Sequence, residues 1–215
     1  MTATYIALVQ FAFRAETPHI ALFLMCAVLP WAWFTAATND ALMSLKRNRG
    51  RLLSFRVNAT IFPLADVLAT LVRYVASLAV FLALLLYYGI RPSPELVWLP
   101  VLILVQGLFA TGVALWLSVL QVYVEDTANI WRLTTRVWFF LGPSIYALSQ
   151  VPAHIAWWLW WNPFTVIFHG YRAIWIRGEP PLMNHLLITS CIAVVFCTSG
   201  YIFIRRVQQR ITLSL

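Results

Sequence analysis

The chain has 215 residues, of which 62% are hydrophobic and only 10% are charged, and its mean hydropathy is +0.81. This composition excludes a soluble globular domain and indicates a polytopic membrane protein. The formal net charge of +8 does not indicate a nucleic-acid-binding protein, because Lys and Arg lie at the ends of apolar runs, where orientation in the membrane accounts for them.

The first element is a short apolar segment, Thr2 to Phe13, which is too short to cross a membrane alone. We interpret it as a truncated first span or a half-helix. Four uninterrupted apolar runs long enough to span a membrane lie beyond it, and each predicts a membrane helix. These runs are Ile20 to Ala37, Pro63 to Tyr88, Val97 to Tyr123 and Leu186 to Ile204.

Basic residues predict how the spans are oriented. The stretch Lys46 to Arg51, with Arg56, is expected in the cytoplasm, and alternation of the spans places Arg132, Arg136 and the arginines of 205–210 there too. Ten of the fifteen Lys and Arg residues fall on this side. The asymmetry predicts an even number of membrane segments, with both termini in the cytoplasm.

One of these spans carries a polar stripe. Asp66, Thr70, Arg73 and Ser77 recur at steps of four, three and four, so they share one helical face. A charge this deep in a span usually faces a bundle interior, a partner or water. Two interpretations are open: a polar path for the substrate with Arg73 receiving an anionic group beside Asp66, or a structural ion pair or an arginine reaching to the interface.

A fifth apolar run, Val137 to Leu148, begins as a membrane span and does not complete one. Its twelve residues cover about 18 Å as a helix, against about 30 Å of hydrocarbon. Pro143 interrupts the run itself, and Pro152 and Pro163 break the segment that follows. Broken helix at membrane depth is tolerated only where protein or a watery cavity receives the freed backbone groups. We therefore expect re-entrant gate helices at one membrane face.

The predicted fold is an all-α membrane bundle with six membrane segments, the fifth of them broken. We expect the segments to form a single transmembrane domain over residues 1–215.

Tryptophans crowd the segment between the last two prolines. Trp157, Trp158, Trp160 and Trp161 occupy four of five positions. Indoles concentrate at membrane interfaces, and their flat faces also suit sugar rings, so the cluster either anchors the gate or lines a glycan path. Helical spacing predicts that Trp157, Trp160 and Trp161 share a face and that Trp158 points away from Trp160.

Motifs for catalysis are not found in the sequence. The one lysine, Lys46, follows Leu45 instead of the glycine of a phosphate-binding loop, and the four histidines are too scattered to suggest metal ligands. We therefore expect no enzyme activity, no metal and no cofactor in this chain.

Eight short segments recur in the order and spacing of a known family. They are 29–34, 48–55, 62–65, 124–126, 139–146, 151–152, 161–163 and 171–172. Together they resemble the type-2 ABC exporter permeases, in the branch that exports capsular polysaccharide, O-antigen and teichoic acid. One departure is Glu125, where the family usually has an arginine before the aspartate of its acidic turn.

The resemblance implies a homodimeric permease in the bacterial inner membrane. It would bind two copies of a separate ABC ATPase subunit, and a lipid-linked or lipid-anchored glycan would pass between the two permeases. It also implies that Arg47, Arg49 and Arg51, together with Glu125 and Asp126, lie where the ATPase couples to the permease.

Two other functions are compatible with the sequence. One is a drug or small-lipid exporter permease of the same superfamily, and the density of aromatic residues on the gate segment favours glycan over it. The other is an integral membrane enzyme of envelope glycan synthesis, for which the few aspartates of the chain offer little support.

Overall fold

The computed structural model describes residues 20–54 and 57–214, and these residues are helical with no strand among them. Within the described ranges, four helices are long and apolar enough to cross a membrane, which confirms the four uninterrupted apolar runs as helices. They are α2 (Ile20–Leu42), α5 (Ile61–Tyr87), α6 (Leu99–Tyr123) and α10 (Met183–Ser214). The predicted segment Thr2 to Phe13 lies outside the described residues.

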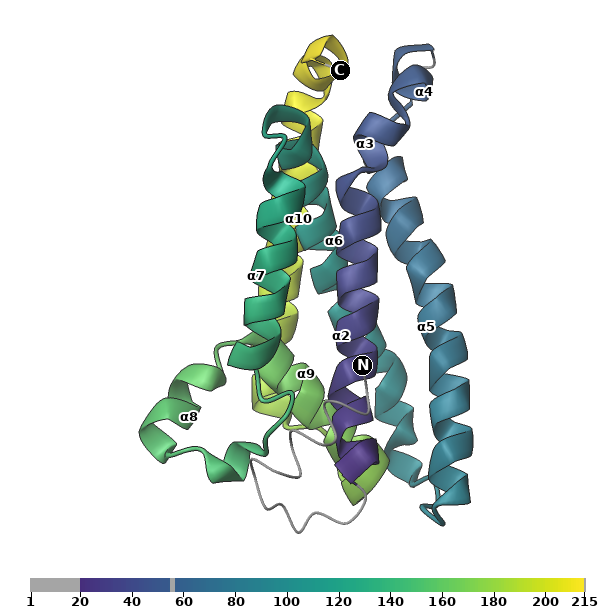
Figure 1. Ribbon diagram of the computed structural model, residues 1–215, viewed down its shortest axis with the longest axis vertical. Coiled ribbons are helices and arrows are strands. Elements are labelled where there is room, and N and C mark those ends of the chain that lie inside the picture. The colour runs from purple at the N-terminus through teal and green to yellow at the C-terminus, as the bar shows by residue number, and fades with distance from the viewer. Residues whose placement is uncertain (1–19, 55–56, 215) are drawn as a thin grey trace.

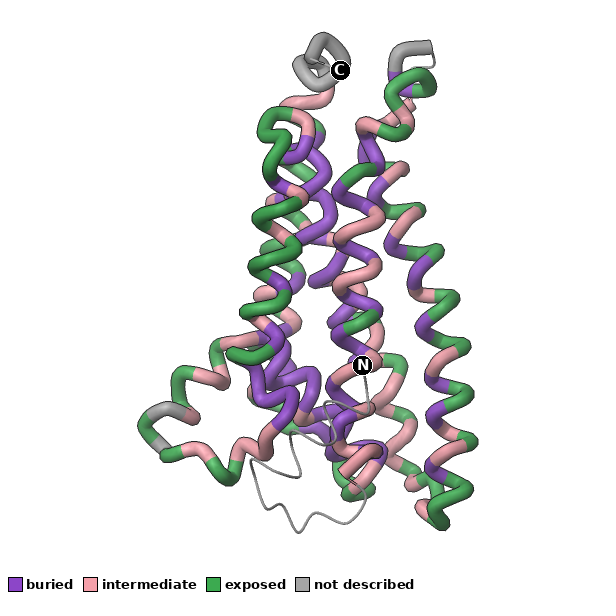
Figure 2. The backbone as a smooth tube through the Cα atoms, in the orientation of Figure 1, coloured by how far each residue is buried: buried purple, intermediate pink, exposed green. Residues whose placement is uncertain are grey.

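The long helices run roughly parallel, with α6 in contact with α2, α5 and α10, and α5 on one flank (Figure 1). Close packing of α6 on α10 depends on glycine: a Cβ at Gly112 would lie 2.6 Å from the backbone nitrogen of Cys197. Small residues allow such close backbone approach between membrane helices. Buried residues lie on the helix sides that face one another, whereas α5 alternates buried and exposed positions along its length (Figure 2).

The fifth segment differs from the expectation in its boundaries. Its helix, α7 (Thr127–Leu141), begins ten residues before the predicted apolar run and ends at Gly142, before Pro143. Arg132 and Arg136, expected in a cytoplasmic loop, are part of this helix. Its fifteen residues cover about 22 Å, still short of about 30 Å of hydrocarbon.

The chain between α7 and α10 folds into short helices, none of which is long enough to cross a membrane. They are η2 (Leu148–Gln150), α8 (Ala153–Leu159), α9 (Pro163–Arg172) and the π-helical turn η3 (Ala173–Arg177). α8 projects from the side of the bundle, whereas α9 is buried along nearly all its length (Figures 1 and 2). Helix boundaries occur at all three prolines: α7 ends before Pro143, Pro152 precedes α8, and Pro163 is the first residue of α9.

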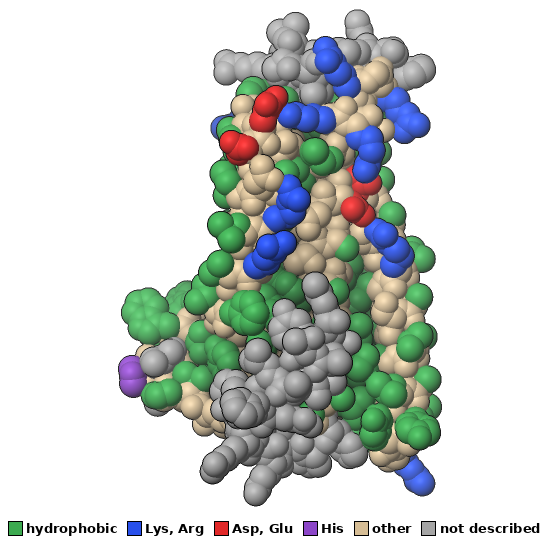
Figure 3. Space-filling model, in the orientation of Figure 1, with side chains coloured by type: hydrophobic (Ala, Val, Ile, Leu, Met, Phe, Trp, Pro, Cys, Tyr) green, Lys and Arg blue, Asp and Glu red, His purple; other side chains and the backbone are tan. Residues whose placement is uncertain are grey.

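The two ends of the bundle differ in composition. α3 (Ser44–Arg47), α4 (Arg49–Ser54), the turn after α6 and the C-terminal part of α10 gather at one end (Figure 1). A small apolar cluster holds them together, formed by Leu45, Leu52, Ala59, Leu115, Val119 and Ile204. Basic side chains concentrate at this end (Figure 3). The opposite end carries η1 (Pro94–Trp98), η3 and the start of α2.

Candidate functional site

The break after α7 is surrounded by a junction of three helices. We define the junction by Trp31 of α2, Trp138 of α7, and Asn162, Phe164 and Arg172 of α9. The ring of Phe164 lies 4.6 Å from that of Trp31 and 5.4 Å from that of Trp138, both edge to face. Aromatic pairs at such distances are favourable beyond the burial of their area. The start of α9 is therefore wedged between α2 and α7.

One asparagine fixes the start of α9 to α7. The Oδ1 atom of Asn162 accepts a hydrogen bond from the backbone N–H of Phe164 at 3.1 Å, which caps the helix. The same oxygen accepts from the Trp138 indole N–H at 3.1 Å. The cap and the interhelical contact thus share one atom, so α9 begins where α7 is in contact with it.

Arg172, at the end of α9, holds the chain that follows the break. Its side chain is buried, and its guanidinium donates to the carbonyls of Pro143 and Ser144, each at 2.7 Å. It also lies 3.6 Å above the ring of Phe23 in α2. Carbonyls beyond a helix end have no intrahelical partner, and the five-donor fork of arginine satisfies several at once. This residue therefore joins α9, α2 and the break.

A second buried polar link ties the same helices to α6. Gln106 is fully buried and donates from Nε2 to the carbonyl of Pro30 at 2.7 Å, and its Oε1 accepts from the Tyr171 hydroxyl at 3.3 Å. Buried polar groups in membrane proteins need such partners. The link runs from α2 through α6 to α9.

The tryptophan cluster splits into two parts. Trp157, Trp158 and Trp161 are more than half exposed and contact one another, with ring centroids 4.9 Å (157–158) and 6.3 Å (157–161) apart. Trp160 instead stacks on His185 of α10 at 4.2 Å, so the predicted shared face of Trp157, Trp160 and Trp161 is wrong. Trp160 caps the C-terminal end of α8 and packs against α10, whereas Trp157 and Trp161 stay exposed.

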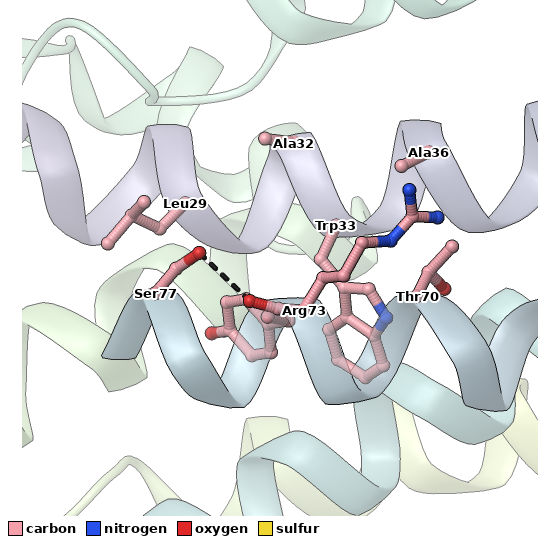
Figure 4. Close-up of a pocket in the computed structure, with 8 residues that line it drawn as sticks. Leu29, Ala32, Trp33, Ala36, Thr70, Arg73 and Ser77 are labelled. Carbon is pink, nitrogen blue, oxygen red and sulfur yellow. Dashed lines mark hydrogen bonds between the residues drawn. The ribbon is translucent and has the colours of Figure 1, made fainter. Parts of the chain in front are cut away.

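The polar stripe of α5 finds counter-ions on other helices. Asp66 accepts from Arg47 of α3 at 2.6 Å, and Arg73 donates to Asp40 of α2 at 2.8 Å. The arrangement agrees with the ion-pair interpretation of these residues. Between α2 and α5 lies a pocket of about 210 Å³, in which Arg73 reaches across to Ala36 (Figure 4). The pocket is lined by Leu29, Ala32, Trp33, Ala36, Thr70, Arg73, Tyr74 and Ser77.

The residues expected at the ATPase contact occupy one end of the bundle. Arg47, Arg49 and Arg51 belong to α3 and α4, and Glu125 and Asp126 form the exposed turn between α6 and α7. The two short helices and the turn all lie at the basic end of the bundle (Figures 1 and 3). Among the residues that the structure describes, no group of three His, Cys, Asp or Glu side chains gathers where a metal ion could bind.

Sequence reasoning missed most of the junction. Trp31 and Trp138 carried no functional expectation, and Arg172 entered only through the resemblance of 171–172 to the family. Asn162 followed by Pro163 was the available signal, because this pair is typical of a helix start.

Known proteins are similar to this chain over most of its length. The family model of the ABC-2 type transporter matches residues 2–176. An O-antigen export system permease protein RfbA from Myxococcus xanthus is 28% identical over 193 residues, which are 89% of this chain and 74% of that protein. A protein of the same name from Klebsiella pneumoniae is 25% identical over 175 residues, 81% of this chain and 68% of that protein.

Proposed function

This chain belongs to the ABC-2 type transporter family, and we propose that it is the permease subunit of an exporter for a lipid-linked polysaccharide of the O-antigen kind. The observation that carries the proposal is the similarity, over most of the chain, to permeases named for O-antigen export. The junction supports it, because the segments that resemble the polysaccharide export branch meet there: Trp31, Asn162, Arg172 and the break at Pro143.

The working assembly would contain two copies of this chain and two copies of a separate ABC ATPase in the bacterial inner membrane. The basic end would face the cytoplasm, with both termini there, as positive residues favour that side. Arg47, Arg49, Arg51, Glu125 and Asp126 would then lie within reach of the ATPase. Energy would come from that partner, because this sequence has no phosphate-binding loop.

The pieces between α7 and α10 would form a re-entrant gate at the opposite membrane face. α9 is buried against α2 and α7 through Phe164, and α8 presents three exposed indoles, Trp157, Trp158 and Trp161. Exposed aromatic faces at the mouth of a path are flat surfaces on which sugar rings can stack. This favours the glycan over the small-molecule alternative.

A deletion strain provides the test. Deleting the gene should abolish surface polysaccharide and cause lipid-linked polymer to accumulate inside the cell, whereas expression of the chain with its partner ATPase should restore export. Restoration should fail with an ATPase partner whose phosphate-loop lysine is replaced. Normal surface polysaccharide without the gene, or loss of the polymer itself instead of its export, would contradict the proposal. The second result would favour an enzyme of glycan synthesis.

A further inference from the structure

The exposed surface of α7 is divided into two stripes. Its buried side carries Thr127, Thr135 and Phe139. A basic stripe of Asn129, Arg132 and Arg136 adjoins it, at helical steps of three and four, and all three side chains are exposed. Apart from Thr134, an apolar stripe covers the rest of the exposed surface, formed by Ile130, Leu133, Val137, Phe140 and Leu141.

Contacts with α2 show how deep the basic stripe lies. Trp131 donates from its indole nitrogen to the Thr38 hydroxyl at 3.1 Å, and the Trp138 ring lies 5.9 Å from that of Phe34. Arg136 is therefore alongside the apolar part of α2, whereas Arg132 is level with Thr38, just beyond the apolar run that ends at Ala37. At a rise of about 1.5 Å per residue, Arg132 and Arg136 lie about 8 Å and about 14 Å from the start of α7.

The two arginines are poorly neutralised for that depth. Arg132 donates to the Asn129 side chain and to the Ala128 carbonyl, both on its own helix. Arg136 makes no hydrogen bond or ion pair with any residue that the structure describes. Arg73, by contrast, has Asp40 as its counter-ion. A charge without a partner at membrane depth must face water or an anion.

The surroundings favour an anion of a particular kind. Figure 3 shows basic side chains part-way down the bundle, below the basic end and above the apolar lower part. Arg132 and Arg136 are one helical turn apart, about 6 Å between their Cβ atoms, so both guanidiniums can reach one phosphate or diphosphate. Phosphate is also the charged group that a lipid presents next to hydrocarbon.

We propose that Arg132 and Arg136 bind the phosphate of the substrate's lipid carrier while the substrate crosses the membrane. The inference rests on the proposed export of a lipid-linked polymer and names the group of that substrate which this surface binds. Arg73 differs from these two arginines, because its guanidinium has Asp40 as a counter-ion.

Binding can be measured without transport. The purified chain in nanodiscs of phosphatidylcholine is titrated with a polyprenyl phosphate, the matching uncharged polyprenol and phosphatidylglycerol, and retained lipid is quantified by native mass spectrometry. The chain should prefer polyprenyl phosphate to both other lipids. Arg136→Gln should weaken that binding by about tenfold, and Arg132→Gln with Arg136→Gln by more, whereas Arg136→Lys should keep most of it. Arg91→Gln, at the other end of the bundle, is the matched control.

Three outcomes would overturn the inference. The double variant could retain as much polyprenyl phosphate as the wild-type chain, or the wild-type chain could retain polyprenol as well as polyprenyl phosphate. The wild-type chain could also retain phosphatidylglycerol as well as polyprenyl phosphate, which would make this a surface for bulk anionic lipid. Export provides an independent second measurement. If the variants lose binding but the wild-type chain exports no polysaccharide, the phosphate site stands and the proposed polysaccharide substrate does not.

Discussion

The guanidinium of Arg172 lies 2.7 Å from the carbonyl of Pro143, so the residue that ends α9 holds the residue at which α7 breaks. The two positions are 29 residues apart in the chain. The same side chain also covers Phe23 of α2, so Arg172 ties the carbonyls of Pro143 and Ser144 at the break to a neighbouring helix.

Replacing this arginine should loosen the break. Arg172→Leu leaves the buried carbonyls of Pro143 and Ser144 without donors, at about 1–3 kcal/mol for each unsatisfied group. Arg172→Lys should recover only part of the loss, since an ammonium group lacks the planar fork. Thermal unfolding of the purified protein in detergent would measure the effect. Arg177→Leu, which removes an exposed pair with Glu179, is the control and should change the midpoint little.

The contact of α6 with α10 gives a second prediction. Gly112→Ala places a methyl group 2.6 Å from the backbone of α10, so the helices must separate, with an expected loss of about 1–3 kcal/mol of unfolding free energy. Gly50→Ala is the matched control, because a Cβ there meets nothing within 4 Å. Equal melting temperatures for the two variants would show that α6 and α10 are further apart than described.

The ion pair of Arg47 with Asp66 should matter more for transport than for stability. It is partly exposed, so Asp66→Asn should cost no more than about 1 kcal/mol of unfolding free energy. If this pair links the ATPase contact to α5, Asp66→Arg should reduce export strongly. Combining Asp66→Arg with Arg47→Asp should restore export, which surface polysaccharide at matched expression would report. If the double variant with exchanged charges restores no export, the ion pair does not couple the ATPase contact to α5.

Replacing a tryptophan of the cluster should affect either export or stability, depending on what that tryptophan contacts. Trp157→Leu and Trp161→Leu should each weaken export, on the order of 1 kcal/mol per lost sugar contact, without changing the melting temperature. Trp160→Leu should lower the melting temperature, because it removes the stack on His185. Phenylalanine at 157 and 161 keeps an aromatic face and should keep most activity. Full export with leucine at both exposed positions would assign those indoles to anchoring at the lipid interface.

Sequence reasoning predicted the long helices well and the short ones poorly, for a physical reason. Uninterrupted apolar runs such as that of α6 are set by the membrane alone, so composition and length define them. The predicted start of α7 was ten residues too late because the first half of this helix is amphipathic. Thr127 and Thr135 are buried, while Arg132 and Arg136 lie on the exposed side. Only packing against α2 shows that such a sequence is one helix.

The candidate site was predictable only in outline. The prolines marked the breaks, because proline restricts the backbone wherever it stands. The partners of the break were not predictable, since Trp31, Gln106 and Arg172 are brought together from three distant parts of the chain. Trp160 was misplaced because its stack on His185 of α10 comes from packing between distant segments, which helical spacing does not report.

The short length of α7 has a consequence for the lipid around the protein. Its fifteen residues span about 22 Å, whereas the neighbouring α2 has 23 residues and spans about 34 Å. A bilayer beside such uneven neighbours must thin locally or admit polar groups, at a modest cost per ångström of mismatch. The hydrocarbon barrier should therefore be narrowest next to α7. A hydrophilic chain attached to a lipid would meet the shortest apolar distance on the side of the permease where the basic stripe lies.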